Sequence, residues 1–376
     1  MGKKDEWRKG VRQRNTFCLS GIMRSRRGRK VRAQLEASGT EAMLVSSPEN
    51  IRYYTGFTGS EALLLLTKRE VVLIVDGRYT SQAKGECAGI AIVESRNKKE
   101  GVAKCVRELG IRKMGFEPDY VTVAQHRDLE RMVDADLVPE QSSAGRVRLI
   151  KDKKEIALIE KSARISSQSF LEVAGEIKAG RKEREVALLL EFRMKAKGAD
   201  AVPFPLMVAS GKRGALPHGL STDKIIRKGE FVTIDFGAVY HGYCSDETCT
   251  LVVGKPTRRQ KKVYRAVKEA HDSAIDKVGP GVRANQIDLT ARELLEKAGL
   301  GKYFRHGTGH GVGLAVHEEP VIAHDRKERI EEGMVFTIEP GVYIPGWGGV
   351  RIEDMVKVNR QGCELMSSAP KELISV

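Results

Sequence analysis

Several familiar signatures are missing from this chain of 376 residues. No apolar run approaches the roughly 18 residues that a membrane span needs; the longest, residues 62–67 and 71–75, have the length of strands. No G-x-G-x-x-G motif follows an expected strand and no Walker loop is present, so neither nucleotide-binding motif is indicated. Residues 17–23 are too short and too polar for the apolar part of a secretory signal. We therefore expect a protein that does not enter or cross a membrane.

Paired cysteines are also missing, because no C-x-x-C motif occurs. We interpret the six scattered cysteines as free thiols of a protein in a reducing compartment, the cytoplasm, rather than as a disulfide framework. These residues are Cys18, Cys87, Cys105, Cys244, Cys249 and Cys363.

Acidic residues are scarce only at the amino terminus. Residues 1–33 hold twelve Lys/Arg and two acids, so they carry +10 of the total charge of +15 and leave +5 to the remaining 343 residues. A nearly balanced body argues against a nucleic-acid-binding protein, although the basic arm itself could contact nucleic acid or an anionic surface. We interpret residues 1–23 as a disordered basic extension; a translation start at Met23 is an alternative.

The sequence predicts two domains after this extension, which makes the fold class α+β. Residues 24–146 alternate short helical and extended stretches, as expected of a small α/β domain. The predicted strands are residues 42–45, 62–66, 71–75, 90–93, 114–116 and 137–138, with helices at 31–38, 102–109 and 124–132 and a turn at 46–50.

Residues 147–376 read as helices around an antiparallel sheet. Asp152 and Glu155 have the spacing of a capping box, which predicts a helix from this point to Gly180. Further helices are expected at residues 182–197, 258–278 and 286–298, and the segments between them are rich in Val, Ile, Thr and Gly.

Two acids in the segment 231–253 carry the first functional signal. Asp235 lies on one face of an expected strand, and a two-residue loop at Tyr240-His241 would place Asp235 directly opposite Asp246. Strands are depleted in Asp, and like charges opposed in a ladder are destabilising. A divalent cation shared by the two acids would turn this repulsion into binding.

A second hairpin repeats the arrangement. If the turn of segment 334–358 is centred at Gly346, then Glu339 faces Glu353. Between the hairpins, His306, His310 and His317 occur within twelve residues among alternating glycines, which disfavour a helix and permit close backbone approach. One more histidine, His218, lies in a loop just before the first hairpin.

These residues predict a site for two metal ions. The ligands are Asp235, Asp246, His310, Glu339 and Glu353. Asp246 and Glu353 would bridge the ions, Asp235 would complete one shell, and His310 with Glu339 the other. Such an oxygen-rich donor set favours Mn²⁺ or Co²⁺ over thiolate-bound zinc, with Zn or Fe as alternatives.

The ligand spacing of 11, 64, 29 and 14 residues resembles that of the proline-specific metallopeptidases, prolidase and Xaa-Pro aminopeptidase. These belong to the creatinase/methionine aminopeptidase superfamily, and the resemblance covers about residues 24–376. It implies a pita-bread catalytic domain behind a creatinase-like amino-terminal domain, and a homodimer. The matching motifs are YYTGFTGS at 53–60, DGRY at 76–79, LPHG at 216–219, DFG at 235–237, SDET at 245–248, GHGVG at 309–313, HE at 317–318, EPG at 339–341 and VRIED at 350–354.

The resemblance also implies roles around the scissile bond. Glu339 would pass a proton to the proline nitrogen, and His317 would donate a hydrogen bond to the tetrahedral oxyanion. His218 and His306 would line the pocket and orient substrate, and Arg351 would hold Glu353 or a neighbouring acid.

One departure bears on the substrate. Prolidases commonly carry an Arg four residues after the position of His317, where this chain has Val321. This favours an Xaa-Pro aminopeptidase acting on longer peptides, with a dipeptide-restricted prolidase and a non-catalytic peptide-binding relative as alternatives. A second departure, Cys249 within Thr248-Cys249-Thr250, is expected to face away from the metals.

Overall fold

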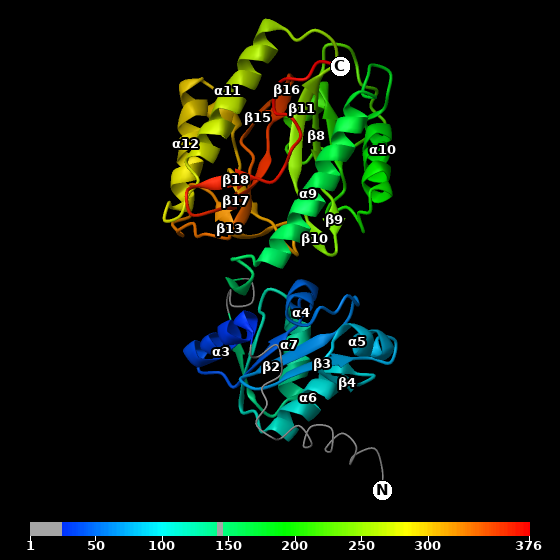
Figure 1. The fold of residues 1–376 in the computed structure, drawn as a ribbon, viewed down its shortest axis with the longest axis vertical. Helices are drawn as coiled ribbons and strands as arrows, with labels where there is room; N and C mark the ends of the chain where they lie inside the picture. Colours follow the sequence, from blue (N-terminus) through cyan, green and yellow to red (C-terminus); the bar gives the residue numbers. More distant parts are fainter. Residues whose placement is uncertain (1–24, 141–145) are drawn as a thin grey trace. The chain divides into compact units, whose positions relative to one another are not determined.

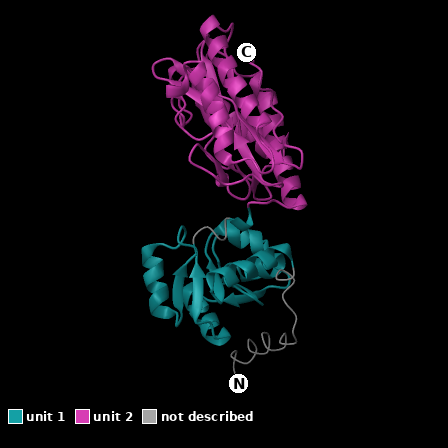
Figure 2. Ribbon diagram, turned by 90° about the vertical axis from the view of Figure 1, so that its left-hand side faces the viewer, with its two compact units in different colours: residues 1–148 teal, residues 149–376 magenta. Residues whose placement is uncertain are grey.

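The computed structural model describes residues 25–140 and 146–376. These fall into two compact units that divide between residues 148 and 149 (Figure 2). The predicted extension at residues 1–23 and Cys18 lie outside the described residues.

The first unit is built on a six-stranded mixed sheet of order β4-β3-β2-β1-β5-β6. β1 pairs parallel with β5, and β2 joins β1 and β3 in antiparallel pairing, so the predicted α/β domain is present. The strands are β1 (Ala42–Val45), β2 (Leu63–Thr67), β3 (Val71–Val75), β4 (Ala91–Glu94), β5 (Lys113–Phe116) and β6 (Asp136–Pro139). The helices are α3 (Arg26–Ser38), α4 (Pro48–Thr55), α5 (Thr80–Glu86), α6 (Lys98–Leu109) and α7 (Val123–Met132).

Four helices of this unit differ from the prediction: α5 is additional, α6 begins four residues before the predicted start at residue 102, and α4 and α3 also differ. The expected turn at residues 46–50 is instead the start of α4, because Pro48 stands in the first helical turn, where its missing N–H costs nothing. Helix α3 begins five residues before the predicted Val31, since Ser25 caps it by accepting a hydrogen bond from the Gly28 N–H at 3.3 Å. Several basic residues of the arm therefore belong to this helix.

The second unit has four long helices: α9 (Lys153–Ala174), α10 (Glu183–Ala196), α11 (Arg258–Asp276) and α12 (Ala284–Lys297). The predicted capping box is present, because Asp152 accepts from the N–H of Glu155 and Glu155 accepts from the N–H of Asp152. Helix α9 ends at Ala174, so its expected extension to Gly180 is wrong; turns occupy the connection.

The strands of the second unit pair antiparallel, as predicted. One sheet contains β7 (Met207–Ser210), β8 (Phe231–Phe236) and β11 (Glu247–Val252). Another contains β12 (Gly309–Gly311), β13 (Glu318–Ile322), β14 (Val335–Ile338), β17 (Asp354–Val358) and β18 (Cys363–Leu365). Two ribbons are β9 (Val239–Tyr240) with β10 (Tyr243–Cys244), and β15 (Gly341–Ile344) with β16 (Gly348–Arg351).

The four helices cover these strands in two pairs. Helices α9 and α10 share one buried apolar cluster with β8 and β11, and α11 and α12 share another with β14 and β17. Figure 1 shows the two helix pairs on opposite sides of the strands.

The register of the first hairpin differs from the prediction. Tyr240 pairs with Tyr243, so the turn is His241-Gly242, and Asp235 faces Thr248 rather than Asp246. Both turn residues have positive φ, 46° at His241 and 79° at Gly242, as a type I′ turn requires. A shift of two residues preserves the face of every side chain.

The register of the second hairpin is as predicted. β15 and β16 pair Ile344 with Gly348, and β14 and β17 pair Ile338 with Asp354, which places Glu339 and Glu353 at facing positions. A bridge between Thr248 and Glu353 then joins β11 to this second hairpin. The two acid-bearing hairpins therefore meet directly.

Candidate metal centre

The five predicted ligands lie on or beside strand ends of the second unit. Asp235 is on β8 and His310 on β12, Asp246 and Glu353 directly precede β11 and β17, and Glu339 directly follows β14. Side chains at strand ends can point into the domain without interrupting the backbone hydrogen bonds of a sheet, and here the five side chains converge.

Three overlapping groups of donor atoms describe this point, and the atoms within each group lie within 4.8 Å of one another. The groups are Asp235, Asp246 and Glu353; His310, Glu339 and Glu353; and Asp246, His310 and His317. Glu353 and Asp246 each belong to two groups. The Nε2 of His310 is 3.5 Å from Asp246 Oδ2 and 3.4 Å from Glu339 Oε1.

The buried carboxylates of this cluster repel one another unless a cation is bound between them. Burial, followed by repulsion from the neighbouring acids, raises the pKa of Asp246 and of Glu353, and burial also raises the pKa of Glu339. Among the described residues, the buried Oδ1 atoms of Asp235 and Asp246 accept no hydrogen bond. Buried acids with unsatisfied oxygens are costly unless they coordinate a metal, so these residues fit a divalent ion.

His310 is oriented as a ligand. Its Nδ1 lies 3.1 Å from the Gly311 carbonyl oxygen, which makes Nδ1 the donor and leaves the Nε2 lone pair facing the acids. Burial lowers the pKa of His310, which favours the neutral ring that a metal ligand requires. The flanking glycine is required by packing, since a Cβ at Gly309 would lie 1.8 Å from the Thr337 carbonyl oxygen.

Arg351 holds Asp235 rather than Glu353. Its Nη2 is 2.5 Å from Asp235 Oδ2, and its other nitrogens donate to Thr248 Oγ1 at 3.0 Å, Tyr343 Oη at 3.1 Å and the Pro217 carbonyl at 3.0 Å. The guanidinium thus fixes one predicted ligand and ties it to two other segments. Such partners of a ligand set its orientation.

The three remaining histidines lie around the cluster. The His317 ring centroid is 4.3 Å from that of His310, and His306 Nε2 is 2.9 Å from Tyr343 Oη. His218 is exposed in a loop after β7. Burial is the main cause that lowers the pKa of His306 and of His317, and the charge of His218 contributes to both shifts. Contacts or electrostatic interactions therefore connect each of these three histidines to the cluster.

Sequence reasoning missed residues that hold this arrangement. Thr248 donates to Glu353 Oε2 at 2.6 Å, and Tyr343 connects Arg351 to His306. Tyr343 is four residues after Glu339 in the second hairpin, so the alternation of side chains along a strand could have placed it on the same face as this predicted ligand.

Two family models match the chain, "Metallopeptidase family M24" over residues 157–360 and "Creatinase/Prolidase N-terminal domain" over residues 27–150. The chain belongs to metallopeptidase family M24. It is a metallopeptidase with the predicted pita-bread catalytic domain, and family membership implies a divalent metal.

Relatives of this M24 chain carry proline-specific names. An Xaa-Pro dipeptidase of Pyrococcus horikoshii is 37% identical over 352 residues, covering 92% of this chain and 98% of the relative. The solved Xaa-Pro dipeptidase from Bacillus anthracis has a TM-score of 0.92 at 39% identity, covering 95% and 100% of the two chains. The solved X-Pro aminopeptidase from Thermotoga maritima has a TM-score of 0.85 at 36% identity, covering 92% and 100%. In the part of the chain that the structure describes, no helix is long and apolar enough to span a bilayer.

Proposed function

We propose that this M24 peptidase hydrolyses the Xaa-Pro bond of dipeptides and that it binds two divalent cations. The observation that carries the proposal is the convergence of four carboxylates and one imidazole in overlapping donor groups. The names of several close relatives, Xaa-Pro dipeptidase and prolidase, support the substrate class.

The donor groups divide naturally between two ions. Asp235, Asp246 and Glu353 would hold one, and His310, Glu339 and Glu353 the other, so that Glu353 serves both; Asp246, which also lies near His310, is the second candidate bridge. When bound, such a pair supplies an activated water and stabilises the developing charge of the reaction. The oxygen-rich set favours Mn or Co, with Zn or Fe as alternatives.

Two side chains of the chain itself would handle the proton and the oxyanion. Glu339, whose Oε1 lies 3.4 Å from His310 Nε2, would accept a proton and deliver it to the proline nitrogen as the bond breaks. His317 is exposed beside His310, where its N–H can donate to the oxyanion.

Three further residues would position the substrate. His306 is held by Tyr343, and His218 lies in a loop whose Pro217 carbonyl accepts from Arg351. Because the guanidinium of Arg351 is already paired with Asp235, we assign to it the orientation of this ligand and of the pocket wall.

The aminopeptidase is the second candidate, and one observation favours it. Val321 lies on β13, paired with His310, at the position where prolidases commonly carry an arginine. A dipeptide's free carboxylate would find no cation there. The dipeptidase is nevertheless preferred, because dipeptidase names prevail among the similar proteins.

The deciding experiment compares Ala-Pro with Ala-Pro-Ala after the protein is loaded with manganese or cobalt. The proposal expects kcat/KM for Ala-Pro to exceed that for Ala-Pro-Ala by about tenfold or more, since the second substrate must place an additional residue in a pocket fitted to the first. Equal or faster cleavage of Ala-Pro-Ala would establish the aminopeptidase instead.

The role of Glu339 is tested separately. Glu339→Gln should lower kcat by about 10²–10⁴, the range expected for a proton-transfer group. The exposed Glu331→Gln serves as the control, and elemental analysis of both variants checks for bound metal. Activity of Glu339→Gln above a tenth of the parent's, with metal retained, would refute the role.

Assembly and location complete the proposal. We propose a homodimer in the cytoplasm, without a nucleic-acid partner; the five described cysteines form no disulfide with one another, in keeping with a reducing compartment. Light scattering should give about twice the chain mass of 41.6 kDa, and a monomer mass would contradict the dimer.

A further inference from the structure

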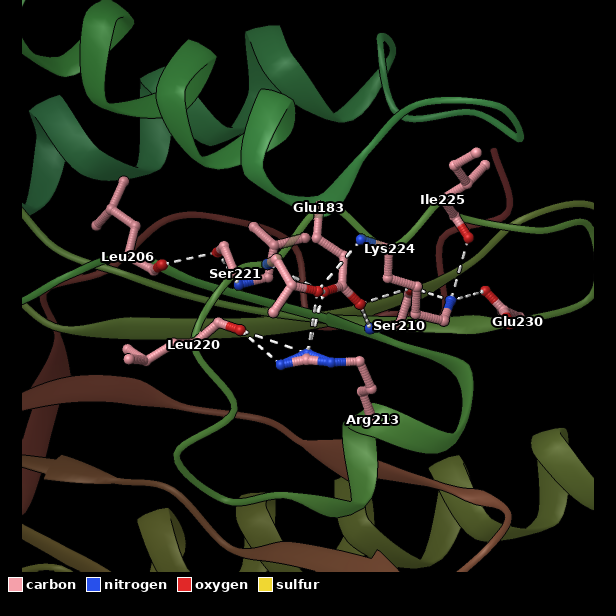
Figure 3. Close-up of polar contacts among 11 residues, drawn as sticks. Glu183, Leu206, Ser210, Arg213, Leu220, Ser221, Lys224, Ile225 and Glu230 are labelled. Carbon is pink, nitrogen blue, oxygen red and sulfur yellow. Dashed lines mark hydrogen bonds and ion pairs between the residues drawn. The ribbon is translucent and has the colours of Figure 1, made fainter.

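A fully buried carboxylate outside the metal centre organises the loop that carries His218. Glu183 is the first residue of α10 and has no exposed surface. An acid in this position would be costly if unsatisfied, yet it is surrounded by donors from a segment 27 to 39 residues later in the chain. Figure 3 places it at the centre of this network.

The two oxygens of Glu183 bind the two ends of one loop. Oε1 accepts from the N–H of Ser210 at 2.8 Å and from its hydroxyl at 2.9 Å, at the point where the chain leaves β7. Oε2 accepts from the hydroxyl of Thr222 at 2.8 Å and from its N–H at 3.3 Å, at the point where the chain returns. A single carboxylate therefore closes the base of the loop at residues 211–221.

Arg213 extends this closure into the loop. Its Nη1 is 3.2 Å from Glu183 Oε2, and its Nη2 donates to the carbonyl of Leu220 at 2.7 Å, two residues after His218. Lys224 adds a donor at the base, with Nζ 2.6 Å from Ser210 Oγ and 2.7 Å from Glu230 Oε2 (Figure 3). The side of the loop after His218 is thus fixed by charged groups.

The side before His218 is fixed by the metal centre. The carbonyl of Pro217 accepts from Arg351 Nη1 at 3.0 Å, and Arg351 is paired with Asp235. His218 stands between these two attachments and is itself exposed. Two anchors, one through Arg351 and one through Glu183 and Arg213, therefore leave its backbone little freedom.

We propose that Glu183 is a positioning residue that sets the place of His218 beside the metal centre; this rests on the proposed function, in which His218 orients the substrate. A carboxylate is required because both oxygens must accept hydrogen bonds. An amide has one acceptor and one donor, so Glu183→Gln would set an NH₂ group against the donors at one end of the loop. The loop would open at its base, and Arg213 would lose its counter-ion.

A double-mutant cycle with substrate kinetics tests the coupling. In the metal-loaded enzyme, Glu183→Gln should lower kcat/KM for Ala-Pro by about tenfold, mainly through KM, as expected when buried donors lose their acceptor. In a His218→Ala background the same substitution should lower kcat/KM by less than about twofold, because the residue through which it acts is gone. Effects that simply multiply, or a His218→Ala variant as active as the parent, would overturn the proposal.

A matched control separates positioning from general destabilisation. Glu155 is also a buried acid in the first turn of a helix, where it accepts from the N–H of Asp152 at 2.9 Å and from Tyr243 Oη at 3.0 Å. Within the part of the chain that the structure describes, the contacts of Glu155 do not involve this loop, so any loss that Glu155→Gln causes should multiply with that of His218→Ala. Coupling of equal size in both cycles would overturn the assignment to Glu183.

Hydrogen exchange supplies a readout independent of activity. Glu183→Gln should speed amide exchange in residues 211–222 by about tenfold, with residues 247–252 of β11 unchanged. Unchanged exchange in the loop, or faster exchange across the whole unit, would overturn the positioning role whatever the activity. If the parent cleaves no Xaa-Pro peptide, the proposed function fails, and the exchange result still decides whether Glu183 holds the loop.

Discussion

Lys371 is expected to be the most consequential cation behind the metal centre. Its Nζ is 2.6 Å from Glu247 Oε1 and 3.3 Å from Asp354 Oδ1, and each of these acids directly follows a predicted metal ligand in the sequence. The lysine side chain is 8% exposed and the two carboxylates 1% and 4%. Lys371→Met would keep the chain length of the side chain and leave two buried acids without their cation.

The size of the expected loss of stability follows from the burial of Lys371 and its two carboxylate partners. Removing one partner of a buried ion pair costs about 3–5 kcal/mol. For a unit of the size of residues 149–376, each kcal/mol lowers Tm by about 2–4 °C, so Lys371→Met should lower Tm by about 6–20 °C. Calorimetry on the metal-loaded protein measures this, with metal content determined in parallel.

The loss should depend on pH with a definite sign. Burial alone would raise the pKa of Asp354, but Lys371 and His271 outweigh it and lower the value. A lowered pKa contributes stability above the ordinary Asp value of about 3.9, and this contribution disappears as the pH falls through the folded-state pKa. Burial leaves the pKa of Glu247 raised even though Lys371 lowers it, so the part of the stability that depends on Glu247 is lost at higher pH than the part that depends on Asp354. The difference between parent and variant should therefore be largest at pH 7–8 and shrink progressively as the pH falls.

Lys357 provides the control, because it is a lysine of β17 with two exposed partners. Its Nζ is 2.8 Å from Glu364 and 3.2 Å from Glu160, whose side chains are 56% and 40% exposed. Exposed pairs contribute about 0–1 kcal/mol, so Lys357→Met should lower Tm by at most about 4 °C. If the two variants lose equal stability, the buried cation is not what holds these strands together.

Three further predictions concern titration and reactivity. Without metal, stability should fall as the pH rises above the ordinary carboxyl pKa of about 4, because burial and mutual repulsion raise the pKa values of Asp246 and Glu353 in the folded protein. Melting curves at a low and a high pH, with and without chelator, measure this, and a stabilisation by metal that is equal at the two pH values contradicts it. Burial alone would lower the pKa of His271, but its two carboxylate partners, Asp272 and Asp354, outweigh burial and raise the value. The stability that the protonated ring contributes below about pH 6.5 should therefore be lost as the pH rises. The free energy of urea unfolding of His271→Gln should then differ from that of the parent more at pH 6 than at pH 8. Burial raises the pKa of Cys249 to about 12, so iodoacetamide at pH 8 should label it only after unfolding, and labelling of the folded protein would show the thiol to be accessible.

Local patterns predicted most of the second unit. The capping box at Asp152 located the start of α9, and alternation in the segment around Gly346 gave the correct register of β14 with β17. The first hairpin was placed two residues out of register, because the turn needs positive φ at both of its central residues and uses His241-Gly242. The error left the ligand face unchanged, since side chains alternate with a period of two.

Residues whose role depends on distant partners could not be predicted. Glu183 reads as an ordinary acid in a first helical turn, and its burial follows only when Ser210 and Thr222 fold over it. Asp288 is another case, a fully buried acid of α12 that accepts from the N–H and hydroxyl of Thr308 at 3.1 and 2.8 Å and so holds the segment between His306 and His310. No spacing rule connects such pairs, because they meet only in the folded chain.

The two layers of charge around β11 and β17 explain why the site depends on the rest of the unit. Asp246 and Glu353 face the expected ions, and the residues that follow them, Glu247 and Asp354, contact Lys371. Consecutive strand residues point to opposite faces, so at the start of each strand one acid points toward the metal site and the next points away from it. Asp246 and Glu353, which point toward the site, need a bound metal cation, whereas Glu247 and Asp354 are paired with Lys371 of the carboxyl-terminal segment. Metal binding and docking of that segment therefore stabilise the same two strands, and loss of either charge source should weaken the other.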